Sequence, residues 1–233
     1  MKLFLLLFTL PLLALSGIPE EKVIPIEHVY IPSGFDDNDN VEIVITGFLP
    51  NLCHKSPSAK VRVADGQVDI KMTSLYYHES NPFCPEMVVP FTETIQLGLM
   101  KEGVYSVNVN ENSEFASSSV LRIDHASSSA VDEHNYAYVD YVEKKAGSNI
   151  VKLKGYHVSD CFVLDSIDYF TNGEDTYSIL PKLKQVKEVC PMKMTQFVYE
   201  FKVPNELNYP KVLLHVRTLN GKSHNTIFVP SEK

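Results

Sequence analysis

The chain has 233 residues, with 21 basic and 29 acidic side chains and a formal net charge of −8. An acidic chain without a basic cluster is repelled by phosphate backbones and anionic lipid, so we expect no nucleic-acid partner. Once an N-terminal leader is set aside, the length suits one large domain or two small ones.

The N-terminus has the pattern of a secretory signal peptide. Lys2 is followed by an apolar run to about Leu13 and then by the small-residue segment Ala14-Leu15-Ser16. This run is too short to cross a bilayer of roughly 30 Å as a helix, which favours a cleaved leader at residues 1–17. A buried N-terminal helix is the alternative. We therefore expect an exported protein, periplasmic or secreted, with no transmembrane segment in its mature chain.

Four cysteines follow the leader: Cys53, Cys84, Cys161 and Cys190. An exported protein meets an oxidising compartment, where disulfides persist. None of the cysteines forms a C-x-x-C pair, so two disulfides are expected in preference to a zinc site. The chain contains no Asn-x-Ser/Thr sequon, which fits bacterial export better than passage through a eukaryotic secretory pathway.

The two halves of the chain resemble each other. VEIVITGFLPNLC, residues 41–53, aligns with NIVKLKGYHVSDC, residues 149–161, and places Gly47 opposite Gly155. The second cysteine of each half is followed by proline. The corresponding cysteines of the two halves lie 108 residues apart (Cys53 and Cys161) and 106 residues apart (Cys84 and Cys190). A constant period of this kind indicates domain duplication. We predict a first domain at 18–125, a linker at 126–133 and a second domain at 134–233.

The repeat also suggests the disulfide pairing. Four cysteines allow three connectivities, and only Cys53–Cys84 with Cys161–Cys190 treats the two halves alike. Each bridge would close a loop of about 30 residues and would stabilise its domain by roughly 3.5 kcal/mol.

Period-two alternation predicts strands throughout the chain. It occurs at Val41–Thr46, Val104–Val109 and Val212–Arg217, between turn signals such as Asp65-Gly66 and Asn220-Gly221. No segment has a helical period longer than two turns. The predicted fold class is all-β, with two tandem immunoglobulin-like β-sandwich domains related by internal duplication.

One segment carries a resemblance to a known architecture. The run Leu97-x-x-Met100-x-x-Gly103-x-Tyr105-x-Val107 resembles the turn before a strand in immunoglobulin-like sandwiches of exported bacterial proteins. That resemblance implies that Tyr105 folds back over the corner, and Tyr209 occupies a loosely similar place in the second half. The absence of tryptophan and the cysteines at strand ends depart from true immunoglobulin domains.

The last predicted hairpin supplies the candidate partner-binding residues. A two-residue turn at Asn220-Gly221 would place Leu213 opposite Phe228 on the outward face, with Ile227 and Val229 facing inward. The apolar pair Leu213 and Phe228 is either a binding patch or a contact with a neighbouring loop or the other domain. On the same face His215 and His224 would be diagonal neighbours, either as metal ligands or as solvated histidines.

Two further segments have alternative interpretations. Asp36, Asp37, Asp39 and Glu42 form an acidic loop that is either a calcium site or a solvated turn, and its spacing is not that of the usual calcium loop. Tyr136 and Tyr138, on one predicted strand face, and Tyr141, on the other, are either a sugar-binding platform or ordinary strand residues. No other metal site and no cofactor is expected.

Catalytic motifs such as G-x-S-x-G and H-E-x-x-H are absent. We therefore expect a non-catalytic binding or structural module of the bacterial cell envelope that acts through contacts with an unknown protein partner. The alternatives are an exported hydrolase with catalytic residues on loops, and an accessory protein that binds calcium or carbohydrate.

Overall fold

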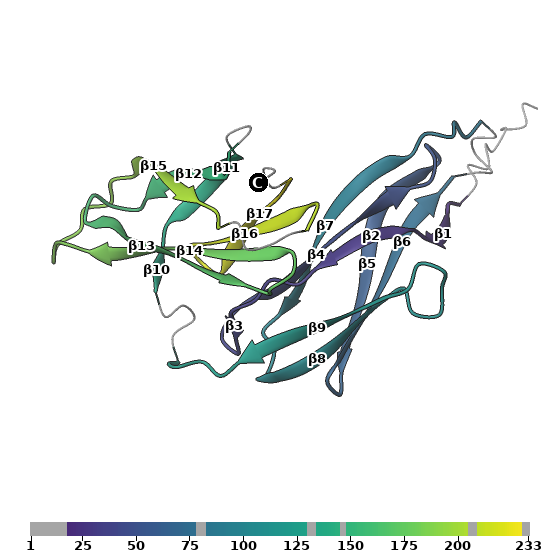
Figure 1. Ribbon diagram of the computed structural model, residues 1–233, viewed down its shortest axis with the longest axis horizontal. Coiled ribbons are helices and arrows are strands. Elements are labelled where there is room, and N and C mark those ends of the chain that lie inside the picture. The colour runs from purple at the N-terminus through teal and green to yellow at the C-terminus, as the bar shows by residue number, and fades with distance from the viewer. Residues whose placement is uncertain (1–17, 78–82, 130–133, 145–147, 205–208, 230–233) are drawn as a thin grey trace, which may run out of the picture.

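The computed structural model describes residues 18–77, 83–129, 134–144, 148–204 and 209–229, and every regular element in these ranges is a β-strand. The strands form four sheets that make two β-sandwiches, which lie side by side along the long axis of the molecule (Figure 1). The all-β prediction is confirmed. No helix in the described ranges is long and apolar enough to span a membrane. The predicted signal peptide at 1–17 and linker residues 130–133 lie outside the described residues.

The described residues of the first sandwich form nine strands. They are β1 Glu20–Val23, β2 Ile26–Tyr30, β3 Phe35–Asp36, β4 Val41–Leu49, β5 His54–Ala64, β6 Gln67–Tyr76, β7 Val89–Gly98, β8 Gly103–Val109 and β9 Ser117–Asp124. The larger sheet has the order β1-β6-β8-β9-β3, with β5 also paired to β6, and the smaller sheet has the order β2-β4-β7.

The second sandwich follows the same plan. Its strands are β10 Asn135–Tyr136, β11 Tyr138–Lys144, β12 Ile150–His157, β13 Phe162–Thr171, β14 Thr176–Gln185, β15 Thr195–Lys202, β16 Val212–Thr218 and β17 Lys222–Phe228. The larger sheet has the order β10-β14-β16-β17, with β13 paired to β14, and the smaller sheet has the order β11-β12-β15.

The two sandwiches correspond strand by strand except for β3, which has no counterpart among the described residues of the second sandwich. β6 pairs with β8 in parallel and β14 pairs with β16 in parallel, whereas β8–β9 and β16–β17 are antiparallel. The smaller sheets correspond as well. This agreement is what duplication of a single domain would produce. The parallel pairs distinguish both sandwiches from an immunoglobulin domain, in which both sheets are antiparallel.

Each sandwich has its own apolar core, built by the inward residues of facing strands. In the first, Ile43 and Ile45 of β4 pack with Val107 of β8 and Leu121 of β9. In the second, Leu153 of β12 belongs to a core that also contains β14 and β16 side chains. Alternation places one side chain in two on each core face, as the period-two pattern predicts.

The repeated glycines lie where two strands approach too closely for a side chain. A Cβ atom at Gly47 would lie 2.3 Å from the Pro25 carbonyl oxygen, and one at Gly155 would lie 1.9 Å from the Tyr138 carbonyl oxygen. Each glycine is paired with a phenylalanine on the third strand of its sheet, Phe91 or Phe197. The sequence repeat thus has a steric cause.

The corner that precedes β8 has the geometry implied by the resemblance. The Tyr105 hydroxyl donates to the Lys101 carbonyl oxygen at 2.9 Å, four residues upstream. In immunoglobulin-like sandwiches a tyrosine of this kind fastens a corner to its strand. Tyr209 does not make such a corner, because its hydroxyl lies 3.1 Å from His28 Nδ1 in the other sandwich.

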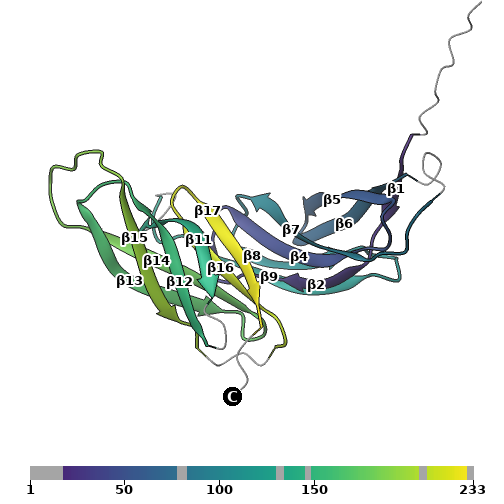
Figure 2. The same cartoon turned by 90° about the horizontal axis from the view of Figure 1, so that it is seen from above.

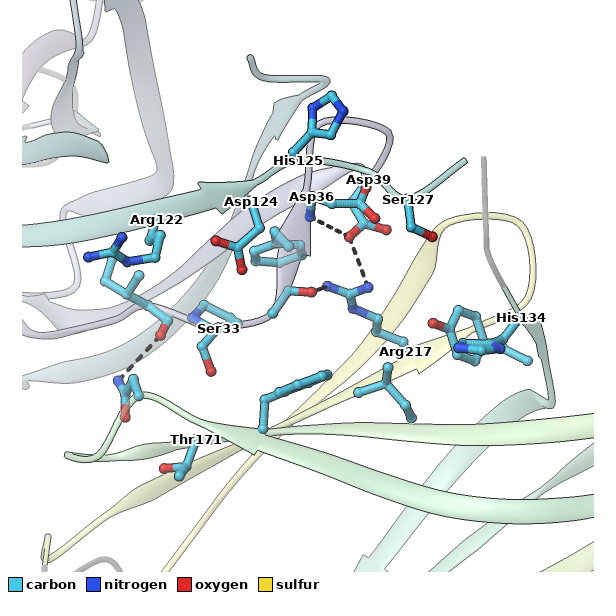
Figure 3. Close-up of a pocket in the computed structure, with 18 of the residues that line it drawn as sticks. Ser33, Asp36, Asp39, Arg122, Asp124, His125, Ser127, His134, Thr171 and Arg217 are labelled. Carbon is cyan, nitrogen blue, oxygen red and sulfur yellow. Dashed lines mark hydrogen bonds and ion pairs between the residues drawn. The ribbon is translucent and has the colours of Figure 1, made fainter. Parts of the chain in front are cut away.

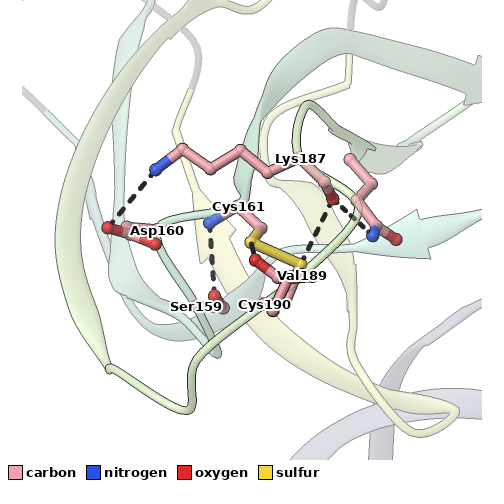
Figure 4. Close-up of a disulfide and its surroundings, with 7 residues drawn as sticks. Ser159, Asp160, Cys161, Lys187, Val189 and Cys190 are labelled. Carbon is pink, nitrogen blue, oxygen red and sulfur yellow. Dashed lines mark hydrogen bonds and ion pairs between the residues drawn. A yellow bond between two sulfur atoms is a disulfide. The ribbon is translucent and has the colours of Figure 1, made fainter.

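Two disulfides are present, Cys53–Cys84 and Cys161–Cys190, and they have the pairing that the repeat suggests. Each joins the connection after β4 or β12 to the segment that precedes β7 or β15. Around the second bridge, Cys161 N donates to Ser159 Oγ at 3.2 Å and Lys187 pairs with Asp160 at 3.5 Å (Figure 4).

Candidate functional site

The two sandwiches contact each other through the outer faces of their sheets. Tyr30 and Val44 from the first sandwich and Leu213 from the second form a separate apolar cluster, with Ile227 packed against it. In both views β16 and β17 lie against the first sandwich (Figure 2). This contact explains why β4 is buried on both of its faces.

Polar groups surround the apolar cluster, and Glu42 of β4 connects several of them. Glu42 Oε1 lies 3.2 Å from His215 Nδ1 and accepts from Asn225 Nδ2 at 2.7 Å; it also accepts from the Ser223 hydroxyl. Gln96 Nε2 donates to Glu42 Oε2 at 2.5 Å. Burial raises the pKa of this carboxyl, but the contacts with His215, Ser223 and Asn225 outweigh burial and hold it at about 2.

A second ionic contact joins Arg217 of β16 to the loop before β4. Arg217 NH1 lies 2.9 Å from Asp39 Oδ2, and NH2 donates to the Gly34 carbonyl oxygen. The guanidinium group also lies over the Phe35 ring, 4.9 Å from its centroid. Burial raises the pKa of Asp39, and Arg217 opposes that effect.

A third group of contacts involves His28 of β2. Its Nε2 bonds to Asp175 Oδ2, and nearby Lys211 Nζ donates to Glu27 Oε1 at 2.7 Å. Burial raises the pKa of Asp175, but its bonds to His28, Asn172 and Thr176 leave it below the ordinary value. Three separate groups of polar contacts therefore fix the second sandwich against the first.

The predicted register of the last hairpin is wrong by one residue. Thr218 pairs with Lys222, so the connection includes Leu219 as well as Asn220 and Gly221. A shift of one residue moves every side chain of a strand to the opposite face. Phe228 therefore pairs with Val212 and lies in the core, whereas Ile227 pairs with Leu213 at the junction.

The proposed partner-binding set is divided by this change. Leu213 and His215 are buried between the sandwiches and Phe228 lies in the core, so these residues do not form an exposed patch. His224 pairs with Val216, on the face opposite to His215, and the two histidines are not neighbours on one face. Burial lowers the pKa of His224. The alternative of packing against the other domain is the one observed for Leu213.

The acidic loop also takes part in the junction. Asp39 and Glu42 contact the second sandwich as described, and Asp37 Oδ1 accepts from the Ala126 backbone N–H at 2.9 Å. Asp36 Oδ1 accepts from the Asn38 backbone N–H at 2.9 Å. Among the described residues no group of three or more His, Cys, Asp or Glu side chains could hold a metal ion. The four carboxylates thus have separate structural contacts.

The predicted tyrosine faces require a correction. The register of β11 with β12 shifts between Val139 and Tyr141, so a β-bulge at Asp140 intervenes. A bulge adds one residue to a strand and redirects the side chains that follow. Tyr138 and Tyr141 are consequently both exposed, while Tyr136 lies buried in β10 at the junction of the sandwiches.

Beside the buried junction lies an open groove of about 650 Å³ (Figure 3). One wall is the outer face of β9, with Val120, Arg122 and Asp124. The other wall is the part of the β13–β14 face that the first sandwich does not cover, where Phe170 and Lys182 lie. The segment from Ile31 to Asp36 forms the floor.

The groove has exposed apolar surface and charges of both signs. Val120 is 66 % exposed and Phe170 is 48 % exposed, although large apolar side chains are usually buried. Lys182 is paired with Asp168 at 2.9 Å, whereas no ion pair is found for Arg122 or Asp124 in the described part of the chain. Asp36 is the cross-strand neighbour of Asp124. The groove thus has a basic side chain beside an acidic pair.

Within the described residues, the Ser33 hydroxyl in the groove is not hydrogen-bonded to a base. The hydroxyl is buried and has no partner among the described residues, so no base activates it. His125 lies 3.3 Å from Glu102 and 3.7 Å from Asp37.

Sequence reasoning missed this groove. The alternation in β9 does reveal Val120, Arg122 and Asp124 as outward residues. Only the packing of the second sandwich makes that face one side of a concave site.

Residues 43–118 match a family described as the ORF11 beta-sandwich domain, which covers most of the first sandwich. No curated protein and no solved structure matches the chain significantly.

Proposed function

We propose that the chain is a non-catalytic binding module that holds an extended segment of a partner protein in the groove between its sandwiches. The observation that carries the proposal is the exposed apolar and charged lining of a groove at a domain interface. Ligand sites occur preferentially at such interfaces, and the volume of about 650 Å³ lies within their usual range.

The junction supports this function by fixing the two walls. The Glu42, Arg217 and His28 contacts join the sandwiches on the side of β4 and β16, so the groove does not depend on its ligand to form. A preformed site avoids the entropic cost of ordering its walls when it binds. Three alternate residues of β9, Val120, Arg122 and Asp124, line the groove, which favours a polypeptide strand over a compact ligand.

The proposal also places the module outside the cytoplasm, in the bacterial cell envelope or in the secreted fraction. Two disulfides support an oxidising location. The N-terminal apolar segment and the absence of glycosylation sequons support bacterial export. Fractionation of cells that produce the full chain, with the mature N-terminus sequenced, tests this part separately.

Site-specific photo-crosslinking tests the binding site. A photoreactive phenylalanine analogue would replace Val120 in the groove or, as a matched control, Val198 on β15, which is 59 % exposed and lies outside it. Residues 18–233 would be exposed to an envelope extract, and the crosslinked segment sequenced by mass spectrometry.

We expect a partner segment crosslinked at position 120 and absent at position 198, and we expect Phe170→Ala to abolish it. Tyr141→Ala removes a similarly exposed aromatic side chain outside the groove and should leave the crosslink unchanged. Equal labelling from positions 120 and 198 would show that the groove is not the binding site.

A further inference from the structure

We infer that the groove selects extended segments in which an acidic and a basic side chain stand two residues apart, next to an apolar residue. This inference rests on the proposed function and specifies the chemistry of the partner. It follows from the order of side chains along β9, where Val120, Arg122 and Asp124 alternate with the core residues Leu121 and Ile123.

The spacing of these side chains sets the spacing of their partners. Residues two apart on a strand lie about 7 Å apart, and Val120 to Asp124 spans about 13 Å. An extended polypeptide has the same repeat, so its alternate side chains meet alternate side chains of β9 in register. A compact ligand would not reach all three positions in this way.

The charges differ along that line. Arg122 is exposed and forms no ion pair within the described chain, so it is available to a carboxylate. Two residues further, Asp124 lies beside Asp36 on the neighbouring strand β3, and together they favour a basic side chain. Figure 3 shows Arg122 at one end of this wall and Asp124 and Asp36 beyond it.

The apolar position of the pattern follows from exposed apolar side chains in the groove. Val120 is exposed on β9, and Phe170 provides an exposed ring on the other wall. The Phe170 ring packs over Gly34, where an added Cβ would lie only 2.6 Å from it, so the ring position is fixed from below. An apolar partner residue opposite Val120 would bury that side chain. The predicted pattern is apolar-x-acidic-x-basic along the partner.

The experiment is a selection from a random-peptide library on immobilised residues 18–233. Three proteins are compared: the unmodified chain, the charge-swapped variant Arg122→Asp with Asp124→Arg, and Phe170→Ala. The swap keeps the net charge and alters two exposed side chains, so the fold should be retained. A circular dichroism spectrum and a melting temperature equal to those of the unmodified chain check this.

We expect the unmodified chain to select apolar-x-acidic-x-basic peptides and the swapped variant to select the order apolar-x-basic-x-acidic. Two synthetic peptides of these patterns should differ in affinity by about tenfold, in opposite directions for the two proteins, because two exposed ion pairs are exchanged.

Two outcomes would contradict the inference in different ways. Peptides that need Phe170 but are selected equally by both charge arrangements would overturn the charge rule and leave the groove as the binding site. Selection of the same peptides by all three proteins would overturn the groove itself and the proposed function with it.

Discussion

His215 Nδ1 lies 3.2 Å from Glu42 Oε1, and the two side chains, which belong to different sandwiches, are only 1 % and 4 % exposed. Burial of a charged group is costly unless its hydrogen bonds are satisfied. Here the partners of Glu42 come from both sandwiches, so the group is satisfied only when they are packed together. The junction therefore couples the stability of one sandwich to the presence of the other.

Replacement of Glu42 should reveal this coupling. We expect Glu42→Ala to lower the free energy of unfolding by about 3 kcal/mol or more, because His215 and Asn225 lose a shared buried acceptor. Urea denaturation measures the loss. Glu143→Ala removes a half-exposed glutamate paired with Lys154 and should cost far less than Glu42→Ala, because solvent screens an exposed pair. Similar losses in the two variants would mean that Glu42 does not stabilise the junction.

The same carboxyl predicts an acid sensitivity. The pKa of Glu42 is about 2 in the folded protein, against an ordinary value of 4.5. A depressed folded pKa contributes stability above pH 4.5, and this contribution is lost as the pH falls toward 2. It amounts to about 3 kcal/mol. The lowered pKa of Asp175 acts in the same direction, and the raised pKa of Asp39 opposes it.

We therefore expect the difference in melting temperature between the unmodified chain and Glu42→Gln to shrink as the pH falls from 6 to 3. Calorimetry at constant ionic strength measures it, which keeps screening of exposed charges constant. A difference that stays constant over this range would show that Glu42 titrates normally in the folded state.

The apolar part of the junction predicts a loss of cooperativity. Leu213 is 0 % exposed and packs between Tyr30 and Val44, so Leu213→Ala should cost about 2–5 kcal/mol. Because the lost contacts join two sandwiches, one calorimetric transition should separate into two. Leu153→Ala creates a comparable cavity inside the second core, where Leu153 is also 0 % exposed. It should lower the melting temperature without splitting the transition.

Much of the fold could be predicted from the sequence because its signals are local. Alternation identified the strands, and the repeated Cys-Pro pairs suggested the disulfide connectivity that is observed. The register of the β16–β17 hairpin could not be predicted from such local signals. An Asn-Gly pair usually marks a two-residue turn, but the connection also takes in Leu219, and that single residue moved Phe228 from the surface into the core.

The candidate site depended on a contact that no local pattern contains. Glu42 and Val44 alternate with core residues in β4, as residues on the solvated face of an ordinary sandwich sheet do. Both are buried because the second sandwich covers that face. The acidic loop was for the same reason interpreted as a calcium site or a solvated turn, whereas Asp39 pairs with Arg217 and Glu42 with His215.

The repeated glycines give a final prediction that tests the correspondence of the two sandwiches. Gly47→Ala would place a methyl group 2.3 Å from the Pro25 carbonyl oxygen, and Gly155→Ala would place one 1.9 Å from the Tyr138 carbonyl oxygen. The nearest atom is backbone in both cases, so relief requires the first strand of the smaller sheet to move away from the second. We expect each substitution to cost about 3 kcal/mol or more, measured by urea denaturation.

A control separates this clash from the loss of glycine's backbone freedom. Gly173 has a φ of +80° and nothing within 4 Å of an added Cβ, so Gly173→Ala should cost only about 1–2 kcal/mol through its backbone conformation. A second substitution identifies the clashing atom. Phe91→Ala removes the ring that lies 2.7 Å from a Cβ at position 47, but it leaves the Pro25 carbonyl in place. The double variant Gly47→Ala with Phe91→Ala should therefore be no more stable than Gly47→Ala, and full recovery would assign the repeated glycine to packing against the ring instead of to the close approach of β2 and β4.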